Sequence, residues 1–491
     1  MPQPDHGNVR DLRPFTDAES AVRRITEIYE ASARQIRERF ARFAAGERTG
    51  DDTFTACYPY LGITVGPGDV VIDARPSYGT LPYAGTYGTT LTRPDLFASY
   101  YRDQIQLLLG YHKVPVFVGI SDQPIPLPFV IEEATADITV DDLRALQEVF
   151  RFPNLSQIDD SIANGTYTPP PGTPLPLALF TAERVDLALQ RLHHYTATDP
   201  RYFQRFVLFT NYQHYVEEFA AYGHRQVANG DGGYVAFVEP GDVITAGPQA
   251  AKAVPVSDRF AARPQMPAYH LVREDRLGIT LVNIGVGPSN AKTITDHLAV
   301  LRPHCWIMIG HCGGLRRSQQ LGDYVLAHAY IREDHVLDQD LPVWVPVPPI
   351  AEIQVALQEA VARVTGFHGR DLKIRMRTGT VASTDNRNWE LRYDELYTRF
   401  NQSRAIAIDM ESATIAANGF RFRVPYGTLL CVSDKPMHGE IKLRGMANAF
   451  YRQRINQHLA IGLEAIRLIR ENGVDQLHSR KLRSFDEPGF R

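Results

Sequence analysis

Apolar side chains recur at helical spacing in the first long segment of the chain, with arginine and glutamate side chains between them. Thr16 and Glu19 have the spacing of a helix capping box, and Gly46 supplies a stop signal at the other end. We therefore predict an amphipathic helix over residues 17–45 whose charged face is exposed to solvent. Its apolar positions are Val22, Ile25, Ile28, Ile36, Phe40 and Phe43.

The rest of the first half mixes helical stretches with short pieces rich in tyrosine, threonine and glycine, which are typical of strands and turns. This order predicts an N-terminal α+β domain over residues 1–250. A proline-rich segment without periodicity, residues 246–267, predicts a linker after it. The predicted helices are 94–109, 140–150, 177–195 and 200–222. The predicted strands are 114–120 and a pair within 234–245.

In the second half, predicted strands and helices alternate regularly. Such alternation builds a mostly parallel sheet with helices on both faces, so residues 268–491 are predicted to form an α/β domain. Ligands of such sheets bind at the carboxyl ends of the strands, where loops converge. The predicted strands are 278–284, 305–309, 324–331, 373–382, 405–408 and 427–433. The predicted helices are 290–301, 351–365, 393–401, 410–420 and 444–469.

The composition argues against several classes of function. The 491 residues carry 52 Lys and Arg against 56 Asp and Glu, and this net charge of −4 gives no general attraction to nucleic acid or an anionic membrane. No apolar run approaches the ~20 residues of a membrane helix, and the N-terminus has no signal-peptide pattern. The four cysteines form no C-x-x-C pair, so neither a disulfide scaffold nor a metal site is predicted. We expect a reduced, cytoplasmic protein.

Two glycine-rich turns follow predicted strands and suit an anion. The first contains Gly287 and Ser289 and opens a helix, whose N-terminus favours negative charge. It lacks the third glycine of the dinucleotide-binding fingerprint, and a purely structural turn is an equal alternative. The second joins Gly313 to Arg316 and Arg317, whose guanidinium groups suit phosphate or carboxylate. Solvent-facing arginines are the alternative there.

Two further strand ends carry carboxylates. Asp409 and Glu411 follow one predicted strand, and Asp434 follows another. Each acid could simply cap a helix. Because the strands belong to one predicted sheet, the acids could also converge on one pocket.

Taken in order, these segments resemble the purine nucleoside phosphorylase/uridine phosphorylase superfamily. The resemblance covers the chain from about residue 278 onward and implies a mixed central sheet flanked by helices. The length of the chain and its large N-terminal domain narrow the resemblance to the members that hydrolyse AMP, because ordinary nucleoside phosphorylases lack such an extension. The motifs that carry it are 285–291, 310–315, 379–385, 409–412 and 432–434.

The resemblance also implies roles for individual residues. Met410 and Glu411 are expected to hold the ribose hydroxyls, and Asp434 to protonate or hydrogen-bond N7 of the purine. Trp389 is expected to stack on the base, with a core tryptophan as the alternative. His311 stands where the superfamily more usually has a small hydroxyl residue, so its role is left open. The residues expected at the phosphate-binding edge are Gly287, Ser289 and Gly313. The basic candidates for the 5′-phosphate are Arg316, Arg317, Lys292 and Arg375.

The activity that the resemblance implies is hydrolysis of the N-glycosidic bond of AMP to adenine and ribose 5-phosphate, with no cofactor needed for the chemistry. A purine nucleoside phosphorylase that uses phosphate as the nucleophile and a non-catalytic nucleotide sensor are the alternatives. MgATP is an expected activator and phosphate an expected inhibitor. The expected partners are AMP and related purine nucleotides, not nucleic acid or membrane, and a homo-oligomer is expected, with a hexamer as one form.

Overall fold

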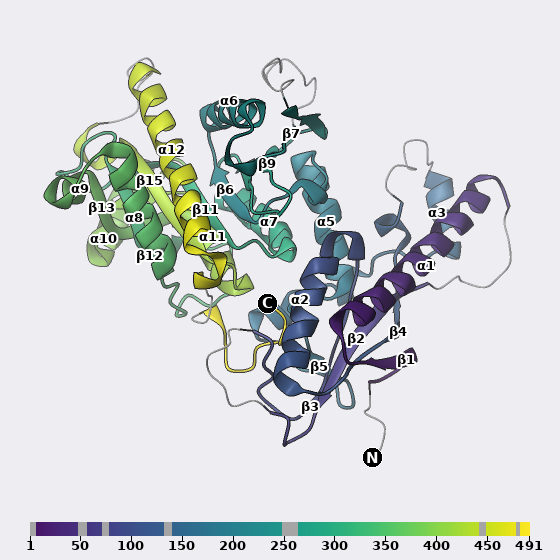
Figure 1. The fold of residues 1–491 in the computed structure, drawn as a ribbon. Coiled ribbons are helices and arrows are strands. Elements are labelled where there is room, and N and C mark those ends of the chain that lie inside the picture. Colours follow the sequence, from purple (N-terminus) through teal and green to yellow (C-terminus); the bar gives the residue numbers. More distant parts are fainter. Residues whose placement is uncertain are drawn as a thin grey trace. The chain divides into compact units, whose positions relative to one another are not determined.

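The computed structural model describes residues 6–47, 56–70, 78–131, 140–247, 264–440, 448–477 and 482–491. The chain divides into two compact units, traced from purple to yellow in Figure 1. The first unit comprises Met1–Gln190 together with Arg483–Arg491, and the second unit comprises Arg191–Leu482. The last residues of the chain therefore belong to the first unit.

The first unit is built on a five-stranded sheet in the order β1-β4-β2-β3-β5. Its pairs are antiparallel except for the parallel pair β3–β5. This unit is α+β, as the sequence predicts. The strands are β1 (Arg10–Phe15), β2 (Cys57–Val65), β3 (Gly85–Thr90), β4 (Val116–Pro124) and β5 (Leu175–Pro176). The helices are α1 (Ala18–Ala44), α2 (Pro94–His112), α3 (Val140–Val149), α4 (Ser161–Asn164) and α5 (Ala182–Thr196), the last of which crosses into the second unit.

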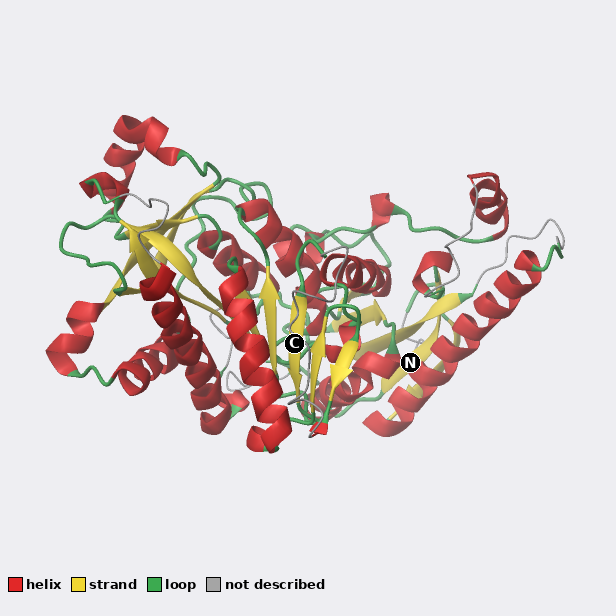
Figure 2. Ribbon diagram, turned by 90° about the horizontal axis from the view of Figure 1, so that it is seen from above, coloured by secondary structure: helices red, strands yellow, loops and turns green. Residues whose placement is uncertain are grey.

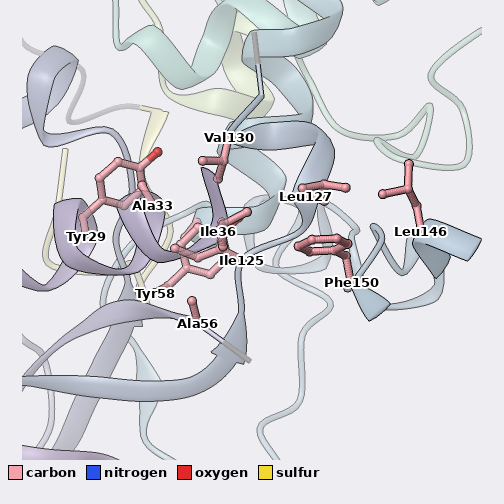
Figure 3. Close-up of a cluster of buried hydrophobic side chains, with 11 residues drawn as sticks. Tyr29, Ala33, Ile36, Ala56, Tyr58, Ile125, Leu127, Val130, Leu146 and Phe150 are labelled. Carbon is pink, nitrogen blue, oxygen red and sulfur yellow. The ribbon is translucent and has the colours of Figure 1, made fainter. Parts of the chain in front are cut away.

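Helix α1 confirms the predicted amphipathic pattern, but its N-cap is not Thr16, the first residue of the predicted capping box. Asp17 is its N-cap, and the Asp17 carboxylate accepts a hydrogen bond of 2.8 Å from the amide of Ser20. The apolar face of the helix contributes Tyr29, Ala33 and Ile36 to the buried cluster in Figure 3. The other labelled members of that cluster are Ala56, Tyr58, Ile125, Leu127, Val130, Leu146 and Phe150.

The second unit is built on a ten-stranded sheet in the order β14-β13-β12-β15-β11-β6-β10-β9-β7-β8. An additional pairing between β14 and β11 closes five of these strands into a ring. Its first five strands along the chain are β6 (Phe206–Thr210), β7 (Ala236–Glu239), β8 (Val243–Thr245), β9 (Ala268–Val272) and β10 (Ile279–Asn283). The later strands are β11 (Cys305–Gly314), β12 (Tyr324–Glu333), β13 (Met376–Thr384), β14 (Ala407–Asp409) and β15 (Tyr426–Asp434).

The sheet of the second unit is mixed. β10, β6, β11 and β15 run parallel to one another, whereas β12 is antiparallel to β15 and β9 is antiparallel to β10. Figure 2 shows its strands in yellow with red helices packed beside them. The helices of this unit are α6 (Gln213–Asn229), α7 (Pro288–Leu298), α8 (Ala351–Thr365), α9 (Gly369–Arg375), α10 (Tyr393–Ser403), α11 (Ser412–Phe422) and α12 (Asn448–Asn472). None of the helices in the described part of the chain combines the length and apolar character that crossing a bilayer requires.

The structure corrects the predicted helix over residues 200–222. This range starts with a single 3-10 turn, Pro200–Tyr202, and continues with the strand β6, which lies between β10 and β11 in the middle of the sheet. Helix α6 begins only at Gln213. All five residues of β6 are buried because the strand is covered on both faces. Such a continuous apolar run carries no alternation, so its period does not separate a strand from a helix.

This correction also moves the domain boundary. The second unit begins at Arg191 and includes β6, α6, β7 and β8. The predicted N-terminal domain, in contrast, extends to residue 250. The predicted linker falls largely on residues 248–263, which lie outside the described residues. The predicted strand 373–382 also shifts, since residues 369–375 form α9 and the strand β13 starts at Met376.

A substitution in β6 tests the assignment of this strand to the core of the second unit. Phe209 is fully buried, so Phe209→Ala is expected to lower the free energy of unfolding by about 3–5 kcal/mol through lost burial and the cavity left behind. The matched control is Leu391→Ala, because Leu391 is 86% exposed, and its expected change is within about 0.5 kcal/mol. Urea titrations followed by circular dichroism measure both. Equal effects of the two substitutions would contradict a central position for β6.

Candidate active site

Several strands of the second unit bring polar groups to one edge of the sheet. β10, β6, β11 and β15 are parallel neighbours, so their carboxyl ends lie at the same edge. The end of β14 reaches this edge as well, because Ile408 pairs with Gly313 near the end of β11. The carboxyl ends of these strands are thus where the candidate site is assembled.

Glu411 is the best-defined residue of the candidate site. It occupies the N-cap position of α11, is 1% exposed, and has both carboxylate oxygens engaged. The amide of Gly287 donates a hydrogen bond of 2.7 Å to Oε1, and the side-chain amide of Asn211 donates one of 3.1 Å to Oε2. Gly287 has a φ of 118°, a conformation that favours glycine, so the turn before α7 needs this residue to present its amide.

The surroundings of Glu411 favour its protonated form. Burial, followed by the neighbouring Asp409 carboxylate, raises the pKa of Glu411 to about 8, although the bonds from Gly287 and Asn211 act in the opposite direction. Burial also raises the pKa of Asp409. At neutral pH the Glu411 carboxyl is therefore largely protonated.

Asp409 anchors the turn that carries Glu411. Its carboxylate accepts a hydrogen bond of 2.5 Å from the hydroxyl of Ser383 and one of 2.9 Å from the amide of Ser412, and it also accepts the Ser412 hydroxyl. These bonds connect the end of β13 to the first turn of α11. The position of Glu411 is thus set by two neighbouring segments as well as by its own hydrogen bonds.

Asp434 ends β15 and lies beside Gly313 in the parallel pairing with β11. The hydroxyl of Ser433 donates a hydrogen bond of 2.5 Å to its Oδ1. Unlike Glu411, Asp434 is partly exposed. It therefore lies at the carboxyl edge of the sheet with part of its surface open.

Tyr212 is influenced by the charges of both predicted carboxylates, Glu411 and Asp434. It directly follows the end of β6, and burial raises its pKa to about 12, with further upward contributions from the charges of Glu411 and Asp434. The charge of Arg387 lowers it. The charges of both carboxylates and of this arginine therefore act on the Tyr212 hydroxyl, which follows the strand β6 beside β11. The convergence of Glu411 and Asp434 that the strand ends suggest is consistent with this arrangement.

The other predicted contact residues occupy varied positions. Ser289 is exposed in the first turn of α7, and Met410 is partly exposed beside Glu411. A Cβ at Gly313 would lie 3.1 Å from Cγ2 of Ile408, so a glycine permits the close approach of β14 to β11. Lys292 forms an ion pair of 2.6 Å with Asp296 one helical turn away.

The predicted arginines differ in how their charge is matched. Arg375 donates to Asp323 at 3.2 Å and to Gln320 at 2.7 Å, and the Asp323 carboxylate is almost fully buried. An internal carboxylate therefore already balances its charge, which removes the reason to assign it to a phosphate. Arg316 is partly exposed and Arg317 is exposed after the end of β11, where both fit the predicted anion-binding turn.

Trp389 is placed as a core residue, the alternative that the sequence left open. It is 7% exposed and packs in a cluster with Leu315, Leu396 and Phe400, and its ring meets that of Phe400 edge-to-face at 5.7 Å. Tyr212, after the end of β6, is the aromatic residue on which the charges of both candidate carboxylates act.

Sequence reasoning missed Asn211, Tyr212 and Arg387. The first two follow the apolar run of β6, so a polar pair after a buried strand was the available signal. The misassignment of β6 to a helix hid it. Arg387 lies three residues beyond the end of β13 and two residues before Trp389, the residue of this segment for which the resemblance implies a role.

The fold and site define a member of the nucleoside phosphorylase superfamily, and comparisons with known proteins agree. A family model described as "Phosphorylase superfamily" matches residues 254–467, and one described as "Bacterial AMP nucleoside phosphorylase N-terminus" matches residues 20–174. An AMP nucleosidase of Escherichia coli is 50% identical over 476 residues, which cover 96% of this chain and 98% of that protein. The chain therefore belongs to the AMP nucleosidase family.

More distant similarities extend over parts of the chain. A 5′-methylthioadenosine/S-adenosylhomocysteine nucleosidase of a Marinomonas species is 24% identical over 158 residues, covering 32% of this chain and 68% of that protein. The crystal structure of an AMP nucleosidase from Bacteroides thetaiotaomicron is 30% identical, with a TM-score of 0.42, over 59% of this chain and 98% of that chain.

The raised pKa of Glu411 predicts a specific pH dependence of stability. Its folded-state pKa of about 8 lies above its ordinary value of 4.5, so its favourable contribution is complete below pH 4.5 and is lost as pH rises through 8. Glu411→Gln removes this loss. The variant is expected to gain stability relative to the unmodified protein by up to about 1.4 kcal/mol per pH unit across that window.

Thermal unfolding scans between pH 5 and pH 9 measure this difference. The matched control is Glu274→Gln, because Glu274 is exposed in the turn between β9 and β10, and its difference from the unmodified protein should stay flat with pH. A flat difference for Glu411→Gln as well would show that Glu411 ionises as freely as an exposed carboxylate.

Proposed function

We propose that the second unit hydrolyses the N-glycosidic bond of AMP and releases adenine and ribose 5-phosphate. The observation that carries this proposal is the placement of Glu411 just after β14 and of Asp434 at the end of β15, two strands that both pair with the end of β11. It is supported by the 50% identity, over nearly the whole chain, to a protein named AMP nucleosidase.

The chemistry of the bond explains why two acids serve this reaction. Breaking an N-glycosidic bond leaves positive charge on the ribose and negative charge on the departing base, as in other glycoside hydrolyses. Glu411 would accept hydrogen bonds from the ribose hydroxyls and favour the cationic ribose when ionised, with Met410 beside the sugar. Asp434 would donate a proton or hydrogen bond to N7, which stabilises the leaving adenine.

Binding of the 5′-phosphate needs donors and positive charge at the edge of the same site. The turns that contain Gly287, Ser289 and Gly313 would line that edge. Arg316 and Arg317 are the basic groups that we propose for the phosphate, because their guanidinium groups can bind two oxygens at once. We propose Arg387 as a third, because it is exposed just after the end of β13 and its charge lowers the pKa of Tyr212.

A product assay tests the proposed reaction. Purified protein incubated with AMP in phosphate-free buffer should release adenine and ribose 5-phosphate in equal amounts. Strict dependence on phosphate, with ribose 1-phosphate formed from adenosine, would replace the proposal with a phosphorylase. Binding of AMP without release of adenine would replace it with a nucleotide sensor. Parallel arms with MgATP and with phosphate test the proposed activation and inhibition.

A substitution tests the role of Asp434. Asp434→Asn keeps the size of the side chain but removes its proton-donating carboxyl, so kcat on AMP is expected to fall about 10²–10⁴-fold. Asp475→Asn is the matched control, because Asp475 is exposed near the end of the second unit and should leave kcat unchanged. Circular dichroism checks that both variants are folded. Near-normal turnover of Asp434→Asn would remove this residue from the mechanism.

We further propose that the protein acts in the cytoplasm as a homo-oligomer, as the resemblance to the superfamily implies. Light scattering on the purified full chain tests the assembly, and a monomer at micromolar concentration would contradict it.

A further inference from the structure

Asn211 is a polar residue of the candidate site to which the proposed chemistry assigns no role. It directly follows β6, and its side-chain amide donates a hydrogen bond of 3.1 Å to Oε2 of Glu411. The backbone amide of Gly287 donates one of 2.7 Å to Oε1. Of these two donors, only the one from Asn211 belongs to a side chain, so it is the one that a substitution can remove.

The packing around Asn211 determines which end of its amide faces the carboxylate. Oδ1 of Asn211 is buried and accepts no hydrogen bond from the described part of the chain, whereas Nδ2 meets a carboxylate oxygen of Glu411. A Cβ at Gly310 of β11 would lie 3.3 Å from Oδ1, so a glycine at that position leaves room for the amide. Asn211 therefore presents its donor end to Glu411.

The two donors come from strand ends that are tied to each other. β6 and β10 are parallel neighbours, and Thr210 pairs with Asn283 where both strands end. The amide of Ile284 donates a hydrogen bond of 2.8 Å to the carbonyl oxygen of Thr210. Asn211 and Gly287 thus approach the carboxylate from two adjacent, hydrogen-bonded segments.

The two hydrogen bonds leave part of the accepting capacity of Glu411 unused. Each oxygen of an ionised carboxylate offers about two acceptor positions, and the bonds from Asn211 and Gly287 occupy one on each oxygen. One position on each oxygen remains, which matches the two neighbouring hydroxyls of a ribose. A protonated carboxyl offers fewer, because the oxygen that carries the hydrogen becomes a donor. The ionised form is therefore the one that can hold both hydroxyls.

We propose that Asn211 is a positioning residue, which keeps the Glu411 carboxylate ionised and oriented to accept hydrogen bonds from the ribose hydroxyls of AMP. This inference rests on the proposed function. Burial and the charge of Asp409 favour the neutral acid of Glu411. The hydrogen bonds from Gly287 and Asn211 favour the carboxylate instead, so Asn211 helps to set the pH above which the site can bind the ribose.

Other titratable and charged groups belong to the same part of the molecule, and a substitution of Asn211 leaves all of them in place. Asp409 lies two residues before Glu411 and acts on it directly. The groups of the neighbouring elements are Tyr212 after β6, His311 and Cys312 of β11, Asp434 of β15 and Arg387 after β13. A pH dependence that changes when Asn211 alone is replaced is therefore assigned to the lost donor.

The decisive variant is Asn211→Leu, which keeps a side chain of similar size and removes the donor. The acid limb of the kcat/KM profile on AMP reports ionisation of a group in the free protein, here Glu411. We expect this limb to move up by about 1–2 pH units, because a hydrogen bond to a charged group contributes about that much. At pH 7 kcat/KM should fall about 10–100-fold, and the deficit should shrink as the pH is raised to 10.

A second variant and a control complete this experiment. Asn211→Ala also lacks the donor and should move the limb in the same direction, which keeps the test decisive if the leucine variant does not fold. Asn401→Leu is the matched control, because Asn401 is exposed on α10 and should keep both the limb and kcat/KM unchanged. A purely structural loss lowers kcat/KM equally at every pH. An unmoved limb in folded Asn211→Leu and Asn211→Ala overturns the proposal.

A measurement that needs no turnover tests the same contact. The stability that Glu411→Gln gains over its parent protein should level off at a higher pH when both proteins carry Asn211→Leu, because the carboxyl then ionises later. Thermal unfolding of the four proteins between pH 5 and pH 10 measures this. A gain that levels off at the same pH with and without Asn211→Leu overturns the proposal.

The outcome for the unmodified protein separates this inference from the proposed function. If the unmodified protein releases no adenine from AMP, the proposed function fails and this inference falls with it. If the unmodified protein is active and the Asn211 variants keep its pH profile, only the role of Asn211 is overturned.

Discussion

The candidate site depends on a single buried carboxylate whose two oxygens are held from two directions. Glu411 receives the amide of Gly287 on one oxygen and the side chain of Asn211 on the other. These donors come from the turn before α7 and the end of β6, while Glu411 itself begins α11. A buried carboxylate without such donors would be costly, so these hydrogen bonds fix three strand ends relative to one another. The same bonds keep the pKa of Glu411 below the value that burial alone would give.

The parts of this arrangement that could be predicted are those that local pattern encodes. A glycine turn after an apolar strand identified Gly287, and acids after apolar strands identified Glu411 and Asp434, because in a sheet of this type strand ends converge. Helix α1 was predictable for a similar reason, since its apolar positions recur with the period of one face. The local pattern predicted only that these residues lie at one edge of the sheet. Their expected roles came from the family resemblance.

The parts that could not be predicted depend on contacts between distant segments. Nothing near Trp389 in the sequence shows that Phe400 and Leu315 cover it, and nothing near Arg375 shows that Asp323 balances its charge. Strand β6 was missed for a different reason: a strand buried on both faces has no alternation, and its identity comes from the two neighbours that pair with it. Misassigning that strand concealed Asn211 and Tyr212, although both lie in the site.

The position of β6 shows that the candidate site depends on a segment between the two regions that the family models match. The two family models cover residues 20–174 and 254–467, and β6 and α6 fall between them, yet these elements belong to the second unit and complete its sheet. They supply Asn211 to Glu411, and they place the ring of Tyr212 and the hydroxyl of Tyr215 against His311 of β11. A segment that looks like a connection between the two matched regions is therefore part of the sheet that carries the candidate site. Substitutions within residues 206–215 should consequently alter the chemistry of the site even when every residue of the recognised motifs is unchanged.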